Sequence, residues 1–343
     1  MKKIKVALVG YGSVGEKIHA PLIHENPEME LTAVVERHAS KSQEKYPQVK
    51  VFRSLEALLE ADVVDLVVIV TPNELHFPQA KLALESGIHV VVDKPVTVFS
   101  GQAKQLDALA KEKGRLLSVF QNRRWDGDFL TVKEILQQGI LGRIVHFESH
   151  FDRFRPHLVN NWREKDLPGS GITYDLGTHL IDQAVVLFGK PDWVYADILK
   201  QRTEAAADDF FDMTLMYGDL KVRLTASVMV NAPLPRFLVL GEKGSYSKYG
   251  LDVQEKAMKA GLPPRGDDWG VEPEESWGKL YLENETKPYP TLGGDYRLFY
   301  QNIADAILGR TALQVKMEEA MMVLEIIEAA FKSHQEGRRV VLG

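Results

Sequence analysis

The sequence predicts an α/β protein of two domains, an N-terminal doubly wound parallel sheet and a C-terminal α+β domain with a large, mostly antiparallel open sheet. Two observations predict this class. In the first third of the chain, short apolar runs alternate with helical stretches, as is typical of parallel strands that are covered on both faces. After Gln121, apolar and polar residues alternate, which is typical of strands with one solvated face. We place the boundary between residues 121 and 122.

The elements of the first domain follow the apolar runs. We expect strands at 4–10, 31–37, 65–71, 89–93 and 116–120. Helices are expected at 77–87 and 101–114, and each ends at a glycine that suits a helix C-cap. Strands and helices that alternate in this way indicate a doubly wound sheet.

The second domain, 122–343, reads mostly as strands. In 219–230, Leu220, Val222 and Leu224 alternate with Lys221 and Arg223, so one face is apolar and the other polar. Further strands are expected at 142–154, 193–203, 236–250 and 338–342, helices from 174, at 295–309 and at 316–334, and a long surface loop at 261–278. Because such an open sheet leaves a broad outer face, we expect a homodimer or homotetramer.

Charge and composition exclude several classes of protein. The 42 Lys and Arg against 48 Asp and Glu give a net charge of -6, and we find no basic block for a row of phosphates, so nucleic acid is excluded as a partner. The absence of cysteine excludes disulfides, a thiol nucleophile and Cys-ligated zinc. No apolar window approaches the ~20 residues of a membrane span, and the start lacks the features of a signal peptide, so we expect a cytoplasmic protein that does not bind membranes.

A glycine-rich turn follows the first strand. Gly10, Gly12 and Gly15 form G-x-G-x-x-G between a strand and a helical stretch, and Glu36 lies at the end of the second strand. This context predicts a Rossmann dinucleotide-binding domain over 1–121, in which the glycines admit the pyrophosphate. Glu36 favours NAD because a carboxylate repels a 2'-phosphate, whereas Arg37 keeps NADP open. The alternative is that the glycines only form a tight turn and that Glu36 and Arg37 are solvated.

Two further stretches lie where parallel strands end, which is where such sheets bind ligands. They are TPNELH (71–76) and DKPV (93–96). Pro95 biases Lys94 toward an extended backbone, which would direct its side chain away from the strand end. The alternative is a surface lysine that caps a strand.

The stretch TYDLGTHLID places Asp175, His179 and Asp182 in an otherwise apolar run. At spacings of four and three, the three side chains share one face of an α-helix. A metal site is one interpretation, but one helix rarely supplies three ligands and no other cluster completes the shell, so we expect no metal. A solvated polar face is the other alternative.

The motifs GSGITYDLGTHLID, TPNELH and G-x-G-x-x-G, with DKP where EKP is usual, resemble the oxidoreductase family named for glucose-fructose oxidoreductase, inositol dehydrogenase and the rhizopine-catabolism protein (Gfo/Idh/MocA). The resemblance covers essentially the whole chain. Stretches such as FQNRRWDGDFLT and FDRFRP look like the branch that contains scyllo-inositol 2-dehydrogenases. The resemblance implies a metal-independent catalytic set of Lys94, Asp175 and His179. It implies cofactor contacts at Gly10, Gly12, Ser13, Val14, Gly15, Glu36, Arg37, Thr71, Pro72, Asn73, His76, Asp93, Lys94, Asn122 and Arg123.

Alcohol oxidation gives these side chains specific tasks. Hydride leaves the carbinol carbon while a base removes the hydroxyl proton, and His179 is our candidate for this base. Asp175 would orient the imidazole or accept a bond from a substrate hydroxyl, and Lys94 would stabilise the developing alkoxide charge. Asp182 stays unassigned. Arg153, Arg155 and Trp162 are candidates for lining the substrate pocket, or else they pack at a domain edge.

The leading hypothesis is an NAD(P)-dependent dehydrogenase that acts on a secondary hydroxyl of a cyclic polyol or sugar, with scyllo-inositol as the first choice. One alternative with the same chemistry is a reductase of another carbonyl, a dihydrodiol or a tetrapyrrole. An alternative from a different class is a non-catalytic protein that senses the redox state of the nucleotide through its Rossmann domain. The sequence does not distinguish among these substrates.

Overall fold

The computed structural model describes residues 3–159 and 161–343, which form two compact units. The first unit comprises the chain up to Trp125 together with 254–269 and 295–320. The second unit comprises 126–253, 270–294 and 321–343. The first interval thus ends close to the boundary expected at residue 121, but two later segments return to the first unit. The domain boundary between residues 121 and 122 therefore stays a prediction.

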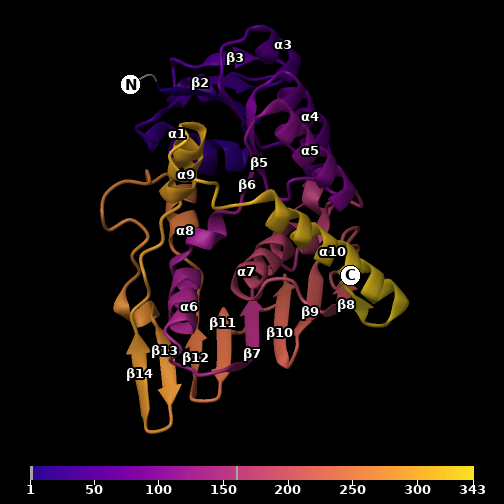
Figure 1. The fold of residues 1–343 in the computed structure, drawn as a ribbon, viewed down its shortest axis with the longest axis vertical. Helices are drawn as coiled ribbons and strands as arrows, with labels where there is room; N and C mark the ends of the chain where they lie inside the picture. Colours follow the sequence, from indigo (N-terminus) through magenta and orange to yellow (C-terminus); the bar gives the residue numbers. More distant parts are fainter. Residues whose placement is uncertain (1–2, 160) are drawn as a thin grey trace. The chain divides into compact units, whose positions relative to one another are not determined.

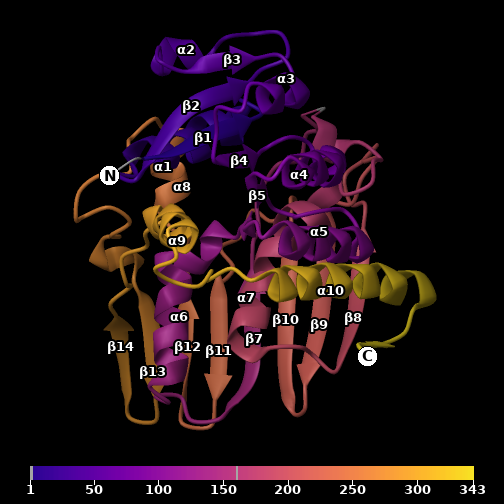
Figure 2. The same ribbon diagram turned by 45° about the horizontal axis from the view of Figure 1, so that its top comes forward.

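The first unit contains a six-stranded parallel sheet with the order β3-β2-β1-β4-β5-β6 (Figures 1 and 2). Its strands are β1 (Ile4–Val9), β2 (Met29–Val35), β3 (Lys50–Phe52), β4 (Leu66–Ile69), β5 (His89–Asp93) and β6 (Leu117–Phe120). This is the order of a doubly wound dinucleotide-binding sheet, in which the order reverses between β1 and β4. Sequence pattern did not predict β3, because three residues are too short for a visible alternation.

Helices of the first unit connect these strands or come from the later segments. They are α1 (Ala20–Glu25), α2 (Ser42–Lys45), α3 (Leu55–Glu60), α4 (His76–Glu85), α5 (Ser100–Lys113), α8 (Gln254–Lys259) and α9 (Arg297–Ile307). Aromatic packing explains why α9 belongs here, since the ring of Phe299 lies 4.9 Å from Phe120 and 5.8 Å from Trp125, centroid to centroid.

The second unit contains a nine-stranded mixed sheet with the order β14-β13-β12-β11-β7-β10-β9-β8-β15. Its strands are β7 (Ile144–His150), β8 (Trp193–Leu199), β9 (Phe210–Tyr217), β10 (Leu220–Ser227), β11 (Phe237–Gly241), β12 (Gly244–Lys248), β13 (Gly278–Leu282), β14 (Glu285–Tyr289) and β15 (Val340–Val341). All pairs are antiparallel except β7 with β10. The predicted fold class is therefore confirmed for both sheets.

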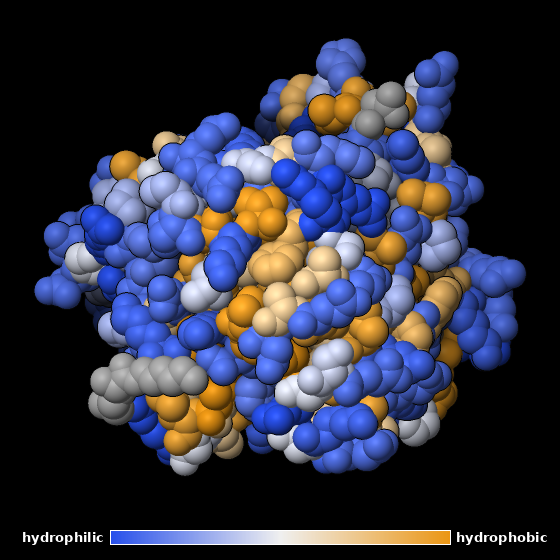
Figure 3. Space-filling model, turned by 90° about the horizontal axis from the view of Figure 1, so that it is seen from above, coloured by the Kyte–Doolittle hydropathy of each residue, from blue (hydrophilic) through white to orange (hydrophobic). Residues whose placement is uncertain are grey.

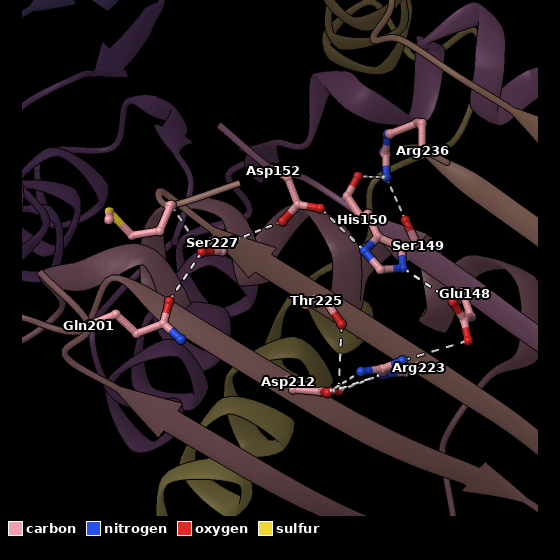
Figure 4. Close-up of polar contacts among 11 residues, drawn as sticks. Glu148, Ser149, His150, Asp152, Gln201, Asp212, Arg223, Thr225, Ser227 and Arg236 are labelled. Atoms are coloured by element: carbon pink, nitrogen blue, oxygen red, sulfur yellow. Dashed lines mark hydrogen bonds and ion pairs between the residues drawn. The ribbon is translucent and has the colours of Figure 1, made fainter. Parts of the chain in front are cut away.

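One face of this sheet is covered by helices α6 (Gly127–Gln137) and α7 (Thr178–Phe188) and by the part of α10 (Met317–Glu336) that belongs to this unit (Figure 2). The covered face is apolar, as the alternation in 219–230 predicts, since Val222 and Leu224 are fully buried. The opposite face carries a polar network that includes Glu148, His150 and Arg223 (Figure 4).

The surface drawn in Figure 3 mixes hydrophilic side chains with several apolar patches. Within residues 3–159 and 161–343, no helix is both long enough and apolar enough to cross a membrane.

Candidate active site

The predicted site residues divide between the two units. Lys94 and all of the predicted cofactor contacts belong to the first unit. Asp175, His179 and the candidate substrate residues Arg153, Arg155 and Trp162 belong to the second. Each half therefore has its own geometry, set by its own sheet.

The glycine turn of the first unit separates a packing role from a binding role. Gly10 has a φ of +99°, and a Cβ added there would lie 2.6 Å from the carbonyl oxygen of Val70. A Cβ on Gly15 would lie 2.5 Å from the carbonyl oxygen of Gly10, so this glycine permits the turn and the helix to pack closely. A Cβ on Gly12 would meet nothing within 4 Å. Gly12 therefore faces open space, as a close approach of a pyrophosphate to the backbone requires.

Beside this turn, the first unit has a pocket of about 1000 Å³. Its lining includes predicted cofactor contacts from three separate strand ends, namely Gly10, Glu36, Arg37, Thr71 and Pro72. Tyr11 also lines it, and burial together with the charge of Glu16 raises the pKa of the Tyr11 phenol to about 12. The phenol therefore keeps its proton at neutral pH. The pocket fits a dinucleotide, because it joins the glycine turn to the end of β2.

The carboxylate of Glu36 is engaged within its own loop. One oxygen accepts the backbone N–H of Lys41 at 3.0 Å. The other accepts the N–H of Ser42 at 3.0 Å and its hydroxyl at 2.5 Å. Glu36 thus holds the start of α2, whereas Arg37 is exposed and lines the pocket. Among the described residues, no carboxylate pairs with the Arg37 guanidinium.

The TPNELH and DKPV stretches are joined by His76. Its Nδ1 lies 2.7 Å from the carbonyl oxygen of Pro95, and its Nε2 lies 2.9 Å from that of Thr71. Burial holds the pKa of His76 below its usual value, although the two carbonyl contacts act in the opposite direction. Its structural effect is to fix the two stretches against each other. Lys94, which precedes a cis peptide bond to Pro95, is half-buried.

The other predicted contacts of the first unit differ in burial. Ser13 is exposed at the glycine turn and Val14 is half-buried, whereas Asn73 and Asn122 are buried. Arg123 is also buried and forms an ion pair with Glu255 of α8. Arg123 therefore ties the end of β6 to a segment that the sequence analysis did not associate with the first domain.

In the second unit, the stretch TYDLGTHLID is not one regular α-helix. Residues Thr173–Gly177 form a π-helical turn, and α7 begins at Thr178. The wider turn breaks the regular spacing on which the shared polar face depended. Asp175 is half-buried, whereas His179 is 6% exposed and Asp182 is 2% exposed. The three residues thus do not form an equally exposed polar face, and Asp182 belongs to the packed interior.

The start of this helical stretch is fixed by Asp208. Its Oδ2 accepts the backbone N–H of Thr173 at 2.8 Å and the hydroxyl of Thr173 at 2.7 Å. Gly171 admits this carboxylate, because a Cβ there would lie 2.0 Å from Asp208 Oδ1 and the φ of Gly171 is +84°. Burial raises the pKa of Asp208 above its usual value. The sequence analysis missed Asp208, since 35 residues separate it from Thr173.

A pocket lies against Asp175 in the second unit. Its lining includes Arg153 and Arg155, two of the candidate substrate residues, but neither Trp162 nor His179. Asp175 Oδ1 lies 3.2 Å from Arg163 Nε, and Asp175 Oδ2 lies 4.0 Å from Arg153 Nη1. The Arg163 guanidinium is 4.6 Å from the ring centroid of Trp162. Trp162 thus supports a pocket residue rather than lining the pocket itself.

An ionic cluster of Arg202, Asp209 and Glu164 lines this pocket, and we call it the Arg202 cluster. Arg202 Nε lies 2.9 Å from Asp209 Oδ2, and Arg202 Nη1 lies 2.9 Å from Glu164 Oε1. Nη1 also donates to the carbonyl oxygens of Arg155 and His157. The cluster therefore holds Arg155, His157 and Glu164 at the edge of the pocket. No short sequence motif indicates it, because the partners lie 7 and 38 residues from Arg202.

Comparison with known proteins matches both units. One family model, described as the NAD-binding Rossmann fold of an oxidoreductase family, matches residues 4–121, and another, described as the C-terminal α/β domain of that family, matches residues 133–342. The oxidoreductase YdgJ of Escherichia coli is 45% identical over 96% of this chain and 96% of its own length. The enzyme IolW of Bacillus subtilis, named scyllo-inositol 2-dehydrogenase (NADP(+)), is 38% identical over 99% of this chain and 96% of its own length. The solved structure of the oxidoreductase yvaA from Bacillus subtilis superposes with a TM-score of 0.96 at 37% identity, covering 100% of this chain and 99% of that one.

Proposed function

Because the chain belongs to the Gfo/Idh/MocA oxidoreductase family, we propose that it transfers hydride between a nicotinamide cofactor and a secondary hydroxyl of a cyclic polyol. The proposed substrate pair is scyllo-inositol and scyllo-inosose. The similarity to IolW over nearly the whole chain supports this pair. The observation that carries the proposal is the pocket of the second unit, in which Asp175 lies beside Arg153 and Arg163.

The polar lining of this pocket suits a hydroxyl-rich ligand. Arginine donates several N–H bonds in a fixed plane, and a carboxylate accepts them, so neighbouring hydroxyls of a ring find both kinds of partner. In our proposal Asp175 accepts a bond from a substrate hydroxyl while Arg153 and Arg163 hold its carboxylate. The ion pair fixes the carboxylate before a ligand arrives, which reduces the entropy lost on binding.

Three residues are proposed to handle the proton. His179 takes the proton of the reacting hydroxyl, because an imidazole can exchange a proton near neutral pH. Lys94 stabilises the negative charge that develops on the oxygen, and Asp175 orients the hydroxyl. The nicotinamide supplies the hydride chemistry when it is bound. Glycines 10, 12 and 15 and the loop at 71–76 would hold the dinucleotide.

For the cofactor we propose NADP in preference to NAD. The sequence analysis favoured NAD because a carboxylate at Glu36 would accept bonds from the ribose hydroxyls. That carboxylate instead accepts three bonds from Lys41 and Ser42, while Arg37 lines the pocket without an acidic partner among the described residues. A guanidinium in this position suits a 2'-phosphate. IolW, which is named as an NADP(+) enzyme, agrees with this choice.

We also propose that the protein is a homodimer or homotetramer that associates through the sheet face opposite α6 and α7. Residues paired across neighbouring strands point to the same face of a sheet. Following these pairs from β8 to β13 places Tyr195, Arg223 and Tyr281 on the face opposite α6 and α7. Both tyrosines are among the exposed large apolar side chains, at 36% and 41%. Exposed aromatic rings beside a polar network are typical of an interface. Light scattering that gives the mass of a monomer would contradict this part of the proposal.

The function is tested by following nicotinamide absorbance with scyllo-inositol, other inositol isomers and aldoses. We expect the highest kcat/KM with scyllo-inositol or scyllo-inosose, and at least a hundredfold loss of kcat in His179→Ala, since general base catalysis typically contributes about 10²–10⁴-fold. Undiminished turnover in that variant would exclude His179 as the base. A protein that binds the dinucleotide but turns over none of these substrates would contradict the proposed function and favour a nucleotide sensor.

A further inference from the structure

A chain of three buried polar side chains lies directly behind the DKPV stretch. His19, in the helical turn that follows Gly15, is 0% exposed. Its Nδ1 lies 2.6 Å from the phenol oxygen of Tyr300 in α9, and its Nε2 lies 3.6 Å from Oδ1 of Asp93 at the end of β5. All three residues belong to the first unit. The chain Tyr300–His19–Asp93 thus links the glycine turn, α9 and the residue that precedes Lys94.

The protonation states of Asp93 and Tyr300, the two outer members of this set, determine which atoms donate and which accept. Burial on its own would raise the pKa of Asp93, but the hydrogen bond from His19 and the positive charges nearby outweigh burial and lower it. Asp93 is therefore a carboxylate, which only accepts hydrogen bonds. Burial raises the pKa of the Tyr300 phenol well above its usual value, so Tyr300 keeps its proton and can donate it.

Between a donor and an acceptor, one imidazole tautomer satisfies both contacts. The Tyr300 hydroxyl donates to Nδ1 of His19, and Nε2–H of His19 points its proton at the Asp93 carboxylate. The ring is held in place by Phe120, at 4.2 Å between ring centroids. A buried histidine with a defined tautomer is a common means of orienting a carboxylate.

The groups that face Asp93 come from four elements, and each has a distinct role. His19 Nε2 lies 3.6 Å from Asp93 Oδ1, Tyr300 is neutral and contacts His19, and Lys94 is the adjacent residue in the chain. His76, at the start of α4, also acts on Asp93 electrostatically, but burial lowers its pKa and both of its nitrogens lie against backbone carbonyls. Asp93 is therefore the fixed negative charge next to the Lys94 ammonium.

We infer that His19 is a positioning residue for this site: it holds the Asp93 carboxylate next to Lys94, and Tyr300 fixes the tautomer of His19 that does so. A fixed carboxylate places a negative charge beside Lys94, the residue proposed to stabilise charge on a substrate oxygen. The role of Lys94 in this inference rests on the proposed function, whereas the tautomer of His19 does not. Asp93 would thus contribute through Lys94 as well as through any contact with the cofactor.

Substitutions at His19 separate its hydrogen bond from its volume. His19→Leu fills a similar volume without a donor, and we expect kcat to fall by about tenfold with little change in KM, because the Asp93 carboxylate loses the contact that orients it. His19→Gln offers an amide N–H close to the position of Nε2, and we expect it to restore most of kcat. His24→Leu is the matched control, since His24 is exposed and lies in the same helical segment.

A folded His19→Leu variant with the kcat of the wild type overturns the inference, and thermal melting establishes whether that variant folds. If it does not fold, Tyr300→Phe decides, because the loss of one hydroxyl frees the tautomer without removing the ring. We expect this variant to show part of the same loss of kcat, and an unchanged kcat would overturn the inference.

A second readout does not require turnover. The ¹⁵N chemical shifts of the His19 ring should show the Nε2–H tautomer in the wild type and a mixture of tautomers in Tyr300→Phe. An Nδ1–H tautomer in the wild type would overturn the inference. If no polyol is turned over by any variant, the proposed function fails while the NMR result still decides the arrangement of Tyr300, His19 and Asp93.

Discussion

Arg202 Nε lies 2.9 Å from Asp209 Oδ2, and both side chains are buried in the second unit. The same guanidinium reaches Glu164 and the backbone carbonyls of Arg155 and His157. Arg202, Asp209 and Glu164 all line the pocket of the second unit, so their ion pairs form part of its wall. Arg202 thus joins the connection between β8 and β9 to the loop that precedes α7.

We expect Arg202→Met to lower the free energy of unfolding by about 3–5 kcal/mol, because the buried Asp209 carboxylate loses its ion-pair partner. Substrate KM should rise by more than kcat falls, since the variant disturbs the pocket wall and leaves the proposed catalytic residues in place. Urea unfolding and steady-state kinetics measure both effects. The control is Arg143→Met, which removes an exposed ion pair with Glu242. The Arg143 side chain is 58% exposed, so its loss should cost at most about 1 kcal/mol. Equal costs in the two variants would contradict a supporting role for the Arg202 cluster.

Asp175→Asn should reduce kcat/KM by at least about a hundredfold, because an amide no longer offers two charged acceptors to a substrate hydroxyl and to the arginines. Arg163→Met removes the closer cation at 3.2 Å and should reduce kcat/KM by about tenfold. Arg155→Met is the matched control, since Arg155 lines the same pocket but forms no ion pair with Asp175. A larger loss in Arg155→Met than in Arg163→Met would show that the Asp175 ion pair is unimportant.

The cofactor proposal predicts a selective effect at Arg37. Arg37→Gln should lower kcat/KM with NADP by about tenfold to a hundredfold, as for the loss of a charge-assisted bond, and should leave kcat/KM with NAD nearly unchanged. Lys50→Gln, an exposed position on β3 outside the pocket, should change neither value. A wild-type preference for NAD would instead support the original prediction from Glu36.

The two roles of the glycines can be separated by one pair of variants. Gly12→Ala adds a methyl group that meets nothing within 4 Å, so we expect an unchanged Tm and at least about tenfold weaker dinucleotide binding. Gly15→Ala places its methyl group 2.5 Å from the Gly10 carbonyl oxygen and should lower the Tm. Fluorescence titration with the reduced dinucleotide measures the affinity. Unchanged affinity in Gly12→Ala would favour the alternative that the glycines only form a turn.

The polar face of the second sheet predicts a pH-dependent stability (Figure 4). Burial on its own lowers the pKa of His150, but its bonds to Asp152 and Glu148 outweigh burial and raise it. Burial on its own raises the pKa of Glu148, but bonds from His146 and His150 outweigh burial and lower it.

His150 and Glu148 contribute to the stability of the fold over different pH ranges. The contribution of His150 is fully present below its unfolded value of 6.5 and is lost as the pH rises through the higher folded pKa. That of Glu148 is fully present above 4.5 and is lost as the pH falls through the lower folded pKa. Wild type should therefore exceed His150→Gln in stability most clearly between pH 4.5 and 6.5, as urea unfolding at pH 5.5 and 8.5 would measure. His157→Gln, an exposed position, should show no such difference. An equal margin at both pH values would contradict the raised pKa of His150.

Local sequence determined the fold class and the identity of most candidate residues. Apolar runs predict β1, β2, β4, β5 and β6 because a strand buried on both faces must be apolar over its whole length. The glycine turn can be recognised in the sequence because, at Gly10 and Gly15, a backbone carbonyl oxygen lies too close for any side chain. The strands β3, β13 and β14 escaped prediction, since strands of only three to five residues carry little periodicity.

Tertiary structure decided what these residues contact. Glu36 is a typical ribose ligand by its place in the sequence, but three bonds engage it within its own loop. Asp175 and His179 are four residues apart, but the π-helical turn at Thr173–Gly177 lies between them and the start of α7 does not continue its spacing. Asp175 lines the pocket, whereas His179 is buried. His19 meets Tyr300 across 281 residues. Sequence pattern reports local periodicity and turn chemistry, whereas such long-range contacts depend on how the sheets and helices pack.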